Sequence, residues 1–295
     1  MSEKIWSVLE LLRWTTDYFR AKGLDTARLD AEILLGFALG SDRLRLYLDF
    51  EKPVLPEERT RFRELVKRRA EERVPVAYLT GVREFWSLTL AVTPDVLVPR
   101  PETETLVEAV LAELPDVEAE LTAFDLGTGS GAIALALAKE RPKLRVVAGD
   151  ISAAALAVAE GNAATHGLAD RVRFLQGDGF ASVMGQRFDV IVSNPPYLAE
   201  AEAASLAPEL AHEPRAALYA GPDGAALLRK IIHEAPIFLA PGGLLALELS
   251  PEQADEVTQC LARGGFEGPK LHRDLGGRLR VVTARCHAVA QLGET

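Results

Sequence analysis

The spacing of apolar residues changes along the chain, and the change divides it into parts. Up to about residue 73 the spacing is helical, with Gly23 and Asp25 marking the end of one helix and the start of the next. Pro56 opens a last helix. We expect a small helical bundle over residues 1–74. The expected apolar faces of its first two helices comprise Ile5, Val8, Leu9 and Leu12, and then Leu29, Ile33, Leu34 and Phe37.

Beyond the bundle, two short extended runs replace the helical spacing, at residues 84–92 and 96–98. The tripeptide Thr93-Pro94-Asp95 between them is typical of a turn. We therefore expect residues 75–98 to form a β-hairpin linker.

From residue 99 to about 290, apolar strand-like runs alternate with helical, alanine- and leucine-rich stretches. Such alternation predicts right-handed βαβ units and a parallel sheet covered on both faces. The expected fold class is α/β, with a mostly parallel seven-stranded sheet. The candidate strands are residues 122–126, 144–149, 172–175, 188–193, 244–249 and 279–284, with a seventh at 266–271 that could pair antiparallel with the last.

Composition and charge narrow the function classes. The 295 residues are 48% hydrophobic and 26% charged, which is typical of a globular protein, and the net charge of −10 argues against broad capture of nucleic-acid phosphates. The two cysteines, Cys260 and Cys286, have no metal-ligand or disulfide spacing, so we expect no metal site. No signal peptide or membrane span is evident, and the cytoplasm is the expected location.

A glycine-rich loop follows the first expected strand of the sheet. Its residues are Gly127, Thr128, Gly129, Ser130 and Gly131. Glycines there let the backbone approach a small ligand closely at a helix N-terminus, although a purely structural tight turn is the alternative. Because the loop also satisfies the dinucleotide fingerprint, a nicotinamide dehydrogenase stays open at this point.

Two carboxylates follow the next strands. Asp150 ends the second strand, where it could accept both hydroxyls of a ribose or simply cap the following helix. Asp178 follows the third, where it could meet an adenine amino group, although a loop aspartate is a common feature.

The run of residues 188–193 stops at Asn194, Pro195, Pro196 and Tyr197. Proline cannot donate to a sheet ladder and restricts the residue before it, so this stop leaves a free carboxamide at the carboxyl end of a buried strand. Ligands bind at that edge of open α/β sheets. A plain strand exit is the alternative.

These elements, taken in order, resemble the class I methyltransferases that use S-adenosyl-L-methionine. The Asn-Pro-Pro-Tyr stretch is similar to the signature of those that methylate amide-like or exocyclic nitrogens. Nearly the whole chain resembles the release-factor glutamine methyltransferases, the PrmC/HemK family. The further matching segments are residues 75–81, 84–85, 98–104, 212–214 and 241–243.

The resemblance implies methylation of the glutamine of the Gly-Gly-Gln motif in class 1 peptide-chain release factors, with S-adenosyl-L-homocysteine as the product. It also implies a helical bundle that recognises the substrate protein, a hairpin linker and a methyltransferase domain over residues 99–290. By position, cofactor contacts fall on the glycine loop, Asp150, Asp178, Gly179 and Asn194. Some relatives have a bulky aromatic where this chain has Gly179, and Phe180 or Leu198 is a candidate to cover the adenine instead.

The chemistry of the Asn-Pro-Pro-Tyr stretch suits an amide nitrogen, whose lone pair is delocalised into its carbonyl. The Asn194 side-chain oxygen and the Pro195 carbonyl could each accept one N–H of the target, and Tyr197 could stack on the flat amide. No general base is assigned. His212 fits a hydrogen-bonding role in a loop, with catalysis as the alternative.

Three rival functions remain at this stage. An adenine-N6 or cytosine-N4 nucleic-acid methyltransferase could use the same tetrapeptide, a scaffold would keep the fold without binding the cofactor, and a dehydrogenase would reduce a nicotinamide. The excess of acidic residues favours a protein substrate, and we expect no direct binding of nucleic acid. We expect a monomer.

Overall fold

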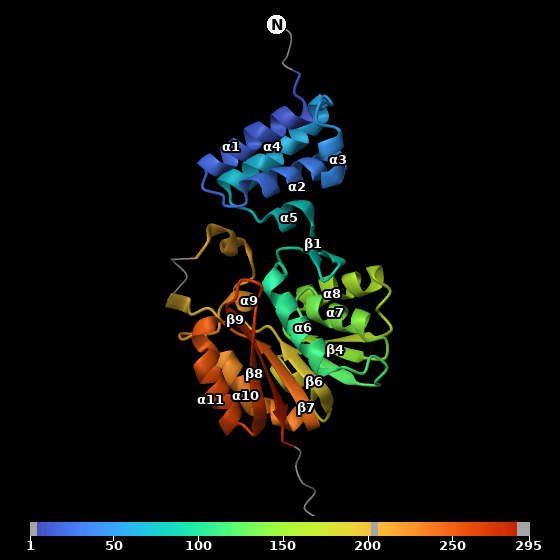
Figure 1. Ribbon diagram of the computed structural model, residues 1–295, viewed down its shortest axis with the longest axis vertical. Helices are drawn as coiled ribbons and strands as arrows, with labels where there is room; N and C mark the ends of the chain where they lie inside the picture. Colours follow the sequence, from blue (N-terminus) through green and yellow to red (C-terminus); the bar gives the residue numbers. More distant parts are fainter. Residues whose placement is uncertain (1–4, 202–205, 288–295) are drawn as a thin grey trace, which may run out of the picture. The chain divides into compact units, whose positions relative to one another are not determined.

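The computed structural model describes residues 5–201 and 206–287, so the predicted domain's residues 288–290 lie outside it. The chain divides into two compact units. The first comprises the described residues up to Val82 together with Ala207–His212, and the second comprises the rest (Figure 1). No described helix is both long enough and apolar enough to cross a membrane.

The first unit is helical, as the sequence predicts, with α2 in contact with both α1 and α4. Ser7 caps the first helix by a reciprocal pair of hydrogen bonds with Glu10, and Gly40 ends the second in a left-handed conformation. The short third and fifth helices were not expected. The helices are α1 Val8–Ala21, α2 Ala27–Leu39, α3 Arg43–Leu48, α4 Pro56–Glu71 and α5 Val76–Thr80.

The predicted apolar faces of the first two helices were wrong in part. Ile5, Leu29 and Phe37 are 74%, 40% and 51% exposed. Ile5 precedes the N-cap of α1, and α2 buries a different face, on which small alanines permit close packing. The buried apolar residues of α2 are Ala27, Ala31, Leu34, Leu35 and Ala38.

A second stretch of chain completes the helical unit. Its short 3-10 helix η4 (Pro208–His212) places Glu209 against two arginines of the α4 region, 2.8 Å from Arg69 and 3.0 Å from Arg73. Arg69 also pairs with Asp30 at 2.7 Å, and both of these side chains are buried. The segment is therefore held by charge-assisted hydrogen bonds.

The hairpin turn lies elsewhere than predicted. Strands β1 (Val82–Phe85) and β2 (Leu88–Ala91) are joined at Trp86 and Ser87, whose φ angles of 49° and 54° are unusual for residues other than glycine. Tertiary contacts hold this turn, since the Trp86 backbone N–H donates to Glu104 and its indole N–H to Glu140. The expected turn at residues 93–95 is a local turn after the hairpin.

The second unit contains a seven-stranded sheet in the order β5-β4-β3-β6-β7-β9-β8. Neighbours run parallel except that β9 is antiparallel to β7 and β8, which confirms the predicted fold class. The strands are β3 Thr122–Leu126, β4 Arg145–Asp150, β5 Val172–Gln176, β6 Phe188–Ser193, β7 Leu239–Glu248, β8 Phe266–Arg273 and β9 Leu279–Cys286.

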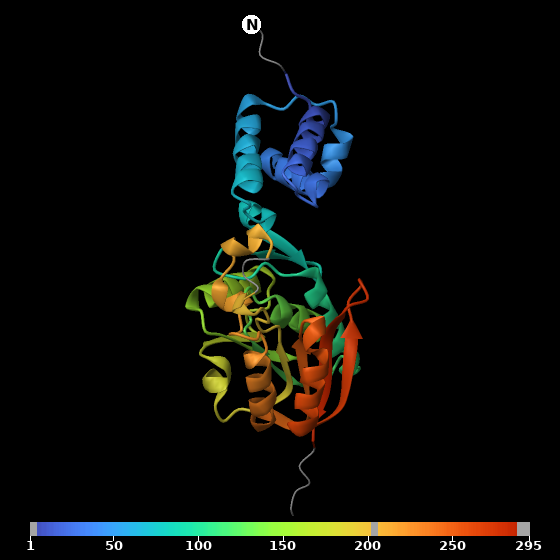
Figure 2. The ribbon, with the colours of Figure 1, turned by 90° about the vertical axis from the view of Figure 1, so that its left-hand side faces the viewer.

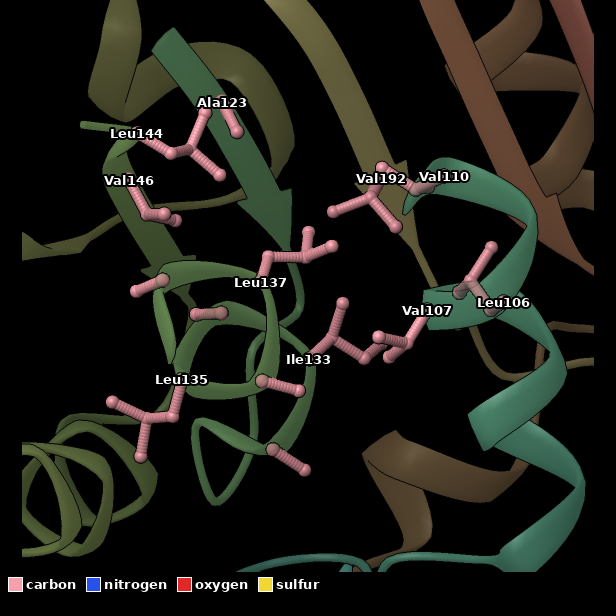
Figure 3. Packing of buried hydrophobic residues seen from close by; sticks show 14 of the residues in the cluster. Leu106, Val107, Val110, Ala123, Ile133, Leu135, Leu137, Leu144, Val146 and Val192 are labelled. Carbon is pink, nitrogen blue, oxygen red and sulfur yellow. The ribbon is translucent and has the colours of Figure 1, made fainter. Parts of the chain in front are cut away.

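Helices cover both faces of this sheet, as Figures 1 and 2 show. Alternate strand residues point to opposite faces: Ala123 belongs to one apolar cluster and Phe124 to the other. The first face is covered by α6 Glu104–Glu113, α7 Ala132–Glu140 and α8 Ala153–Thr165, and the second by α10 Ala226–Phe238 and α11 Ala254–Arg263. In Figure 3, Val107 and Ile133 point toward one another between α6 and α7, two of the helices that contribute to the first cluster.

The strand order reverses next to β3, which has β4 on one side and β6 on the other. Chain segments leaving the carboxyl ends of β3 and β6 therefore diverge and open a crevice, the place where ligands bind in such sheets. The glycine loop, Asp150 and Asn194 follow or end β3, β4 and β6. The fold thus brings together three segments that the sequence placed on separate strands.

Candidate active site

The glycine loop is a tight turn after β3. Gly127, Gly129 and Gly131 have φ angles of 79°, 55° and 82°. Residues that carry a Cβ adopt this left-handed region only at a cost in free energy. A Cβ at Gly127 or Gly129 would have no neighbour within 4 Å, so glycine there leaves the backbone bare toward the cavity that both residues line. The backbone N–H of Gly127 donates to the Gly149 carbonyl at 2.8 Å, which joins the loop to β4.

A buried carboxyl group holds the glycine loop by hydrogen bonds. Asp125 is fully buried, and its Oδ2 accepts hydrogen bonds from the Thr128 hydroxyl at 2.7 Å and the Ala134 backbone N–H at 3.2 Å. Burial raises the pKa of Asp125 to about 7, and the nearby Asp150 charge acts in the same direction. Asp125 therefore connects the loop to the first turn of α7.

Asp150 lies at the end of β4 beside this loop. Its Oδ2 accepts the Gly129 N–H at 2.9 Å and its Oδ1 accepts the Ser152 N–H at 2.9 Å. The cap of α8 is Ser152, whose hydroxyl accepts from the Ala155 N–H, so Asp150 is not the capping residue. Each carboxylate oxygen retains a further lone pair for a ligand hydroxyl.

Asp178 and Gly179 also line the cavity. The Asp178 side chain is 71% exposed and lies 3.7 Å from Lys230. Phe180 does not line the cavity, because it is buried in the second apolar cluster and stacks on Phe238. Leu198 is not among the lining residues either, whereas the 60% exposed Ile151 is, together with Leu97 and Leu227.

The Asn-Pro-Pro-Tyr stretch leaves β6 at the same edge. The preceding Ser193 is fully buried and donates to the Leu126 carbonyl at 2.6 Å, which fixes the end of β6 to the end of β3. The Asn194 amide nitrogen donates to the Thr103 hydroxyl at 3.1 Å. Pro195 is buried, and burial raises the pKa of Tyr197, so its phenol is neutral at physiological pH.

Backbone contacts then hold the chain after Tyr197. The Leu198 N–H donates to the Leu218 carbonyl, at the end of helix α9 (Arg215–Leu218). Gly224, with a φ of 71°, lies so close that a Cβ on it would be 2.5 Å from the Tyr197 carbonyl oxygen. The side chain of Gln253 joins the two by donating to both carbonyls.

One cavity of about 260 Å³ connects these segments within the second unit. It runs from the glycine loop and Asp150 to Asn194, Pro195 and Pro196. Its mixture of apolar walls with a few polar groups is typical of a small-molecule site. The cavity brings together part of the predicted cofactor and substrate residues: Gly127, Gly129, Asp150, Asp178, Gly179, Asn194, Pro195 and Pro196 line it, whereas Thr128, Ser130, Gly131 and Tyr197 do not.

A buried glutamate supports another wall of the cavity. The side chain of Glu213 accepts from the Val98 N–H at 3.2 Å and from the Arg100 guanidinium at 2.6 Å. The next residue, Pro214, lines the cavity. The neighbouring His212 contacts the Glu72 carbonyl at 2.7 Å, as its predicted loop role requires.

Sequence reasoning assigned no role to Thr103 or Glu248, which lie beside the Asn-Pro-Pro-Tyr stretch. Glu248 is the last residue of β7 and is 1% exposed. A signal was available, because Glu248 is a carboxylate at the carboxyl end of a predicted strand, as Asp150 is. Thr103 gave no such signal, since its contact with Asn194 joins residues far apart in sequence.

Two protein-family models match the chain. The PrmC N-terminal domain matches residues 10–81, and the Methyltransferase small domain matches residues 103–225. The first of these lies in the helical part of the chain, and the second contains the glycine loop, Asp150 and Asn194.

Solved structures of low sequence identity share the fold. The hMettl16 catalytic domain has a TM-score of 0.57 at 14% identity, covering 83% of this chain and 87% of that chain. The T. thermophilus 16S rRNA N2 methyltransferase RsmC has a TM-score of 0.53 at 21% identity, covering 70% of this chain and 50% of that chain. Both likenesses show the methyltransferase fold alone.

Curated relatives match over almost the full length. The release factor glutamine methyltransferase of Rhodopirellula baltica is 46% identical over 94% of this chain and 96% of its own. That of Geobacter sulfurreducens is 46% identical over 97% and 99%, and that of Salmonella typhimurium is 44% identical over 88% and 93%. With its two domain matches and these relatives, the chain belongs to the release factor glutamine methyltransferase family.

Proposed function

We propose that this protein transfers a methyl group from S-adenosyl-L-methionine to the side-chain amide nitrogen of the glutamine in the Gly-Gly-Gln motif of class 1 release factors. The observation that carries the proposal is the single cavity that runs from the glycine loop to Asn194–Pro196. A methyl donor held at one end would present its methyl carbon to an amide held at the other. Membership of the family supports the choice of substrate.

The residues present fit S-adenosyl-L-methionine. Bare backbone at Gly127 and Gly129 accommodates a close ligand, and the carboxylate of Asp150 offers acceptors for the two ribose hydroxyls. Ile151 supplies an apolar surface for the adenine. When bound, this cofactor supplies a methyl carbon attached to a positively charged sulfur, and S-adenosyl-L-homocysteine is the product.

The Asn-Pro-Pro-Tyr stretch would orient the target amide. The Asn194 side-chain oxygen and the Pro195 carbonyl each accept one N–H of the glutamine, which fixes the plane of the amide and aims its nitrogen at the methyl carbon. Both acceptors also stabilise the positive charge that grows on that nitrogen in the transition state. Tyr197 stacks on the flat face of the amide.

The proton needs no strong base. With the cofactor bound, the glutamine nitrogen would form the new N–C bond with its lone pair, and the sulfur would keep the electrons of the broken S–C bond. The methylated nitrogen is then cationic and acidic, and it loses its extra proton to water. The same acceptors, Asn194 and Pro195, hold the amide while this proton leaves.

The remaining parts of the proposal concern recognition. We assign the helical bundle to recognition of the release factor and residues 75–98 to the linker. The protein would act as a monomer in the cytoplasm, where release factors work, without binding nucleic acid directly.

Mass spectrometry of an unmethylated class 1 release factor, incubated with this protein and S-adenosyl-L-methionine, tests the proposal. We expect one added methyl group, located by peptide mapping on the Gly-Gly-Gln glutamine. A parallel reaction contains duplex DNA and RNA in place of the factor. Label on nucleic acid with an unmodified factor would establish the rival nucleic-acid methyltransferase and contradict the proposal.

The carboxylate of Asp150 gives a separate test of the cofactor site. We expect Asp150→Ala to weaken S-adenosyl-L-methionine binding by about 1–3 kcal/mol, because charge-assisted hydrogen bonds to the ribose are lost. Titration calorimetry measures this change. Asp255→Ala, at an exposed residue of α11, is a control that makes the same change in net charge and should bind normally. Equal affinities in the two variants would remove Asp150 from the site.

A further inference from the structure

The Asn-Pro-Pro-Tyr stretch has few backbone groups with which to hold its own position. Pro195 and Pro196 have no N–H, so neither can donate a hydrogen bond to the rest of the protein. The proposed role of the Pro195 carbonyl also requires that oxygen to stay available for the target amide. The placement of the stretch therefore depends on contacts at its two ends. At the first end, the Ser193 hydroxyl donates to the Leu126 carbonyl at 2.6 Å.

The side chain of Gln253 makes the contact at the second end. Its amide nitrogen donates to the Tyr197 carbonyl at 3.4 Å and to the Gly224 carbonyl at 2.9 Å. Its Oε1 accepts from the Ser250 backbone N–H at 3.1 Å. A backbone N–H only donates and a carbonyl only accepts, so these partners permit a single orientation of the amide. The direction of all three hydrogen bonds follows from the backbone alone.

Gln253 is attached to the strand next to the one that carries the stretch. It is the last residue of the 3-10 helix η5 (Pro251–Gln253), which begins shortly after the end of β7. Strand β7 pairs with β6, and Leu247 lies opposite Ser193. Gln253 is 8% exposed. Its hydrogen bonds therefore tie the far end of the stretch to the neighbouring strand of the same sheet.

The bond to Gly224 restrains the same part of the chain. Gly224 packs against the backbone of residues 197–199 so closely that a side chain there would collide with it. Holding the Gly224 carbonyl in place therefore also restricts the backbone at and after Tyr197. If these bonds served only to stabilise the fold, their loss would lower the free energy of unfolding and leave the chemistry of the folded enzyme unchanged.

We infer that Gln253 is a positioning residue that sets the placement of the Asn-Pro-Pro-Tyr stretch relative to the methyl donor. The inference rests on the proposed function, because it concerns the stretch that would hold the target amide. Gln253 does not line the cavity, so it acts through the backbone of Tyr197 and Gly224. Methyl transfer needs the amide nitrogen in line with the S–C bond, and a small displacement of the stretch would misalign the two.

Steady-state methylation of a class 1 release factor by two variants tests the inference. Gln253→Met removes the amide at similar length, and Gln253→Glu keeps an acceptor for the Ser250 N–H but loses the donating NH₂ group. Each should lower kcat by about tenfold or more, because the target amide is misplaced. Titration calorimetry should show wild-type affinity for S-adenosyl-L-methionine, since the glycine loop and Asp150 are untouched. Gln253→Glu is the milder change and serves if Gln253→Met does not fold.

Asn162 provides a matched control, because it is a buried amide with the same set of backbone contacts. It is 2% exposed, its Oδ1 accepts from the Ala91 N–H at 2.7 Å, and its nitrogen donates to the carbonyls of Ala91 and Ser130 at 3.0 and 2.9 Å. Asn162→Leu should lose a similar amount of stability in denaturant unfolding. At saturating S-adenosyl-L-methionine it should keep a kcat close to wild type, because it does not contact the stretch. Equal losses of kcat in Asn162→Leu and Gln253→Met would leave Gln253 a structural role alone.

A double-mutant cycle with Asn194→Ala gives a readout that a structural role would not move. If Gln253 acts by placing the stretch, its effect should shrink once the Asn194 acceptor is gone. The loss of kcat in the double variant should then be smaller than the product of the two single losses. Losses that multiply, or a wild-type kcat in the Gln253 variants, would overturn the inference. A wild-type protein that leaves the factor unmodified contradicts the proposed function instead, so the two failures are distinguishable.

Discussion

Replacement of Asn194 by alanine should reduce turnover on the release factor by about 100-fold or more, the usual cost of removing a group that stabilises developing charge in a transition state. The variant would lose the acceptor that we propose fixes the plane of the target amide. Its binding of S-adenosyl-L-methionine should stay within a few-fold of wild type, because the glycine loop and Asp150 are untouched. Single-turnover methylation and titration calorimetry separate the two effects.

A conservative variant sharpens this test. Asn194→Asp keeps an acceptor oxygen but loses the N–H that donates to Thr103, so it should retain more turnover than Asn194→Ala and less than wild type. Normal turnover in Asn194→Ala would show that the carboxamide has no part in the reaction. A large loss of cofactor affinity would reassign Asn194 to the methyl donor.

Gly224→Ala should destabilise the segment that follows Tyr197. The new Cβ would lie 2.5 Å from the Tyr197 carbonyl oxygen and 3.1 Å from the Ala199 nitrogen, so the backbone must move. The left-handed φ of 71° adds about 1–2 kcal/mol, and the steric conflict adds about 1–3 kcal/mol. Denaturant unfolding should show this loss, and methylation of the factor should fall because the stretch that we propose binds the target amide is displaced.

Gly221 provides the matched control for this substitution. It lies three positions earlier with a φ of 81°, and a Cβ there would meet only the Ala226 Cβ at 3.9 Å. Gly221→Ala therefore has the backbone cost without the steric conflict. If both variants lose stability and activity equally, the close approach of Gly224 to Tyr197 has no consequence.

The strands of the sheet could be predicted because each is a short run of buried residues between clear interruptions. Phe188–Ser193 and Thr122–Leu126 were placed to the residue. Strand β7 begins at Leu239, earlier than expected, because Leu239 pairs with Phe188 and a register shift follows before Leu244 pairs with Val190. The hairpin turn at Trp86 was missed because hydrogen bonds to glutamates remote in sequence hold this turn, and local sequence does not reveal such contacts.

The residues of the candidate site also differ in how far the sequence reveals them. That Asp150 and Asn194 lie near one another could be predicted, because the carboxyl ends of parallel strands meet at one edge of a sheet. The supports of that site could not be found, because Thr103, Gly224 and Gln253 act through contacts across 27 to 91 positions of sequence. Phe180 was proposed as an adenine cover because it is aromatic, but sequence does not reveal that it packs into the core.

The return of Ala207–His212 to the helical unit has a consequence for engineering. The chain passes between the two units three times, after Val82, before Ala207 and after His212. A catalytic fragment that starts at Arg83 would retain six residues that belong to the missing part, with Glu209 deprived of Arg69 and Arg73. To transfer this bundle to the catalytic part of a relative, both stretches must be transplanted together. If residues 207–212 were left behind, Arg69 would keep Asp30 but lose Glu209 as a carboxylate partner.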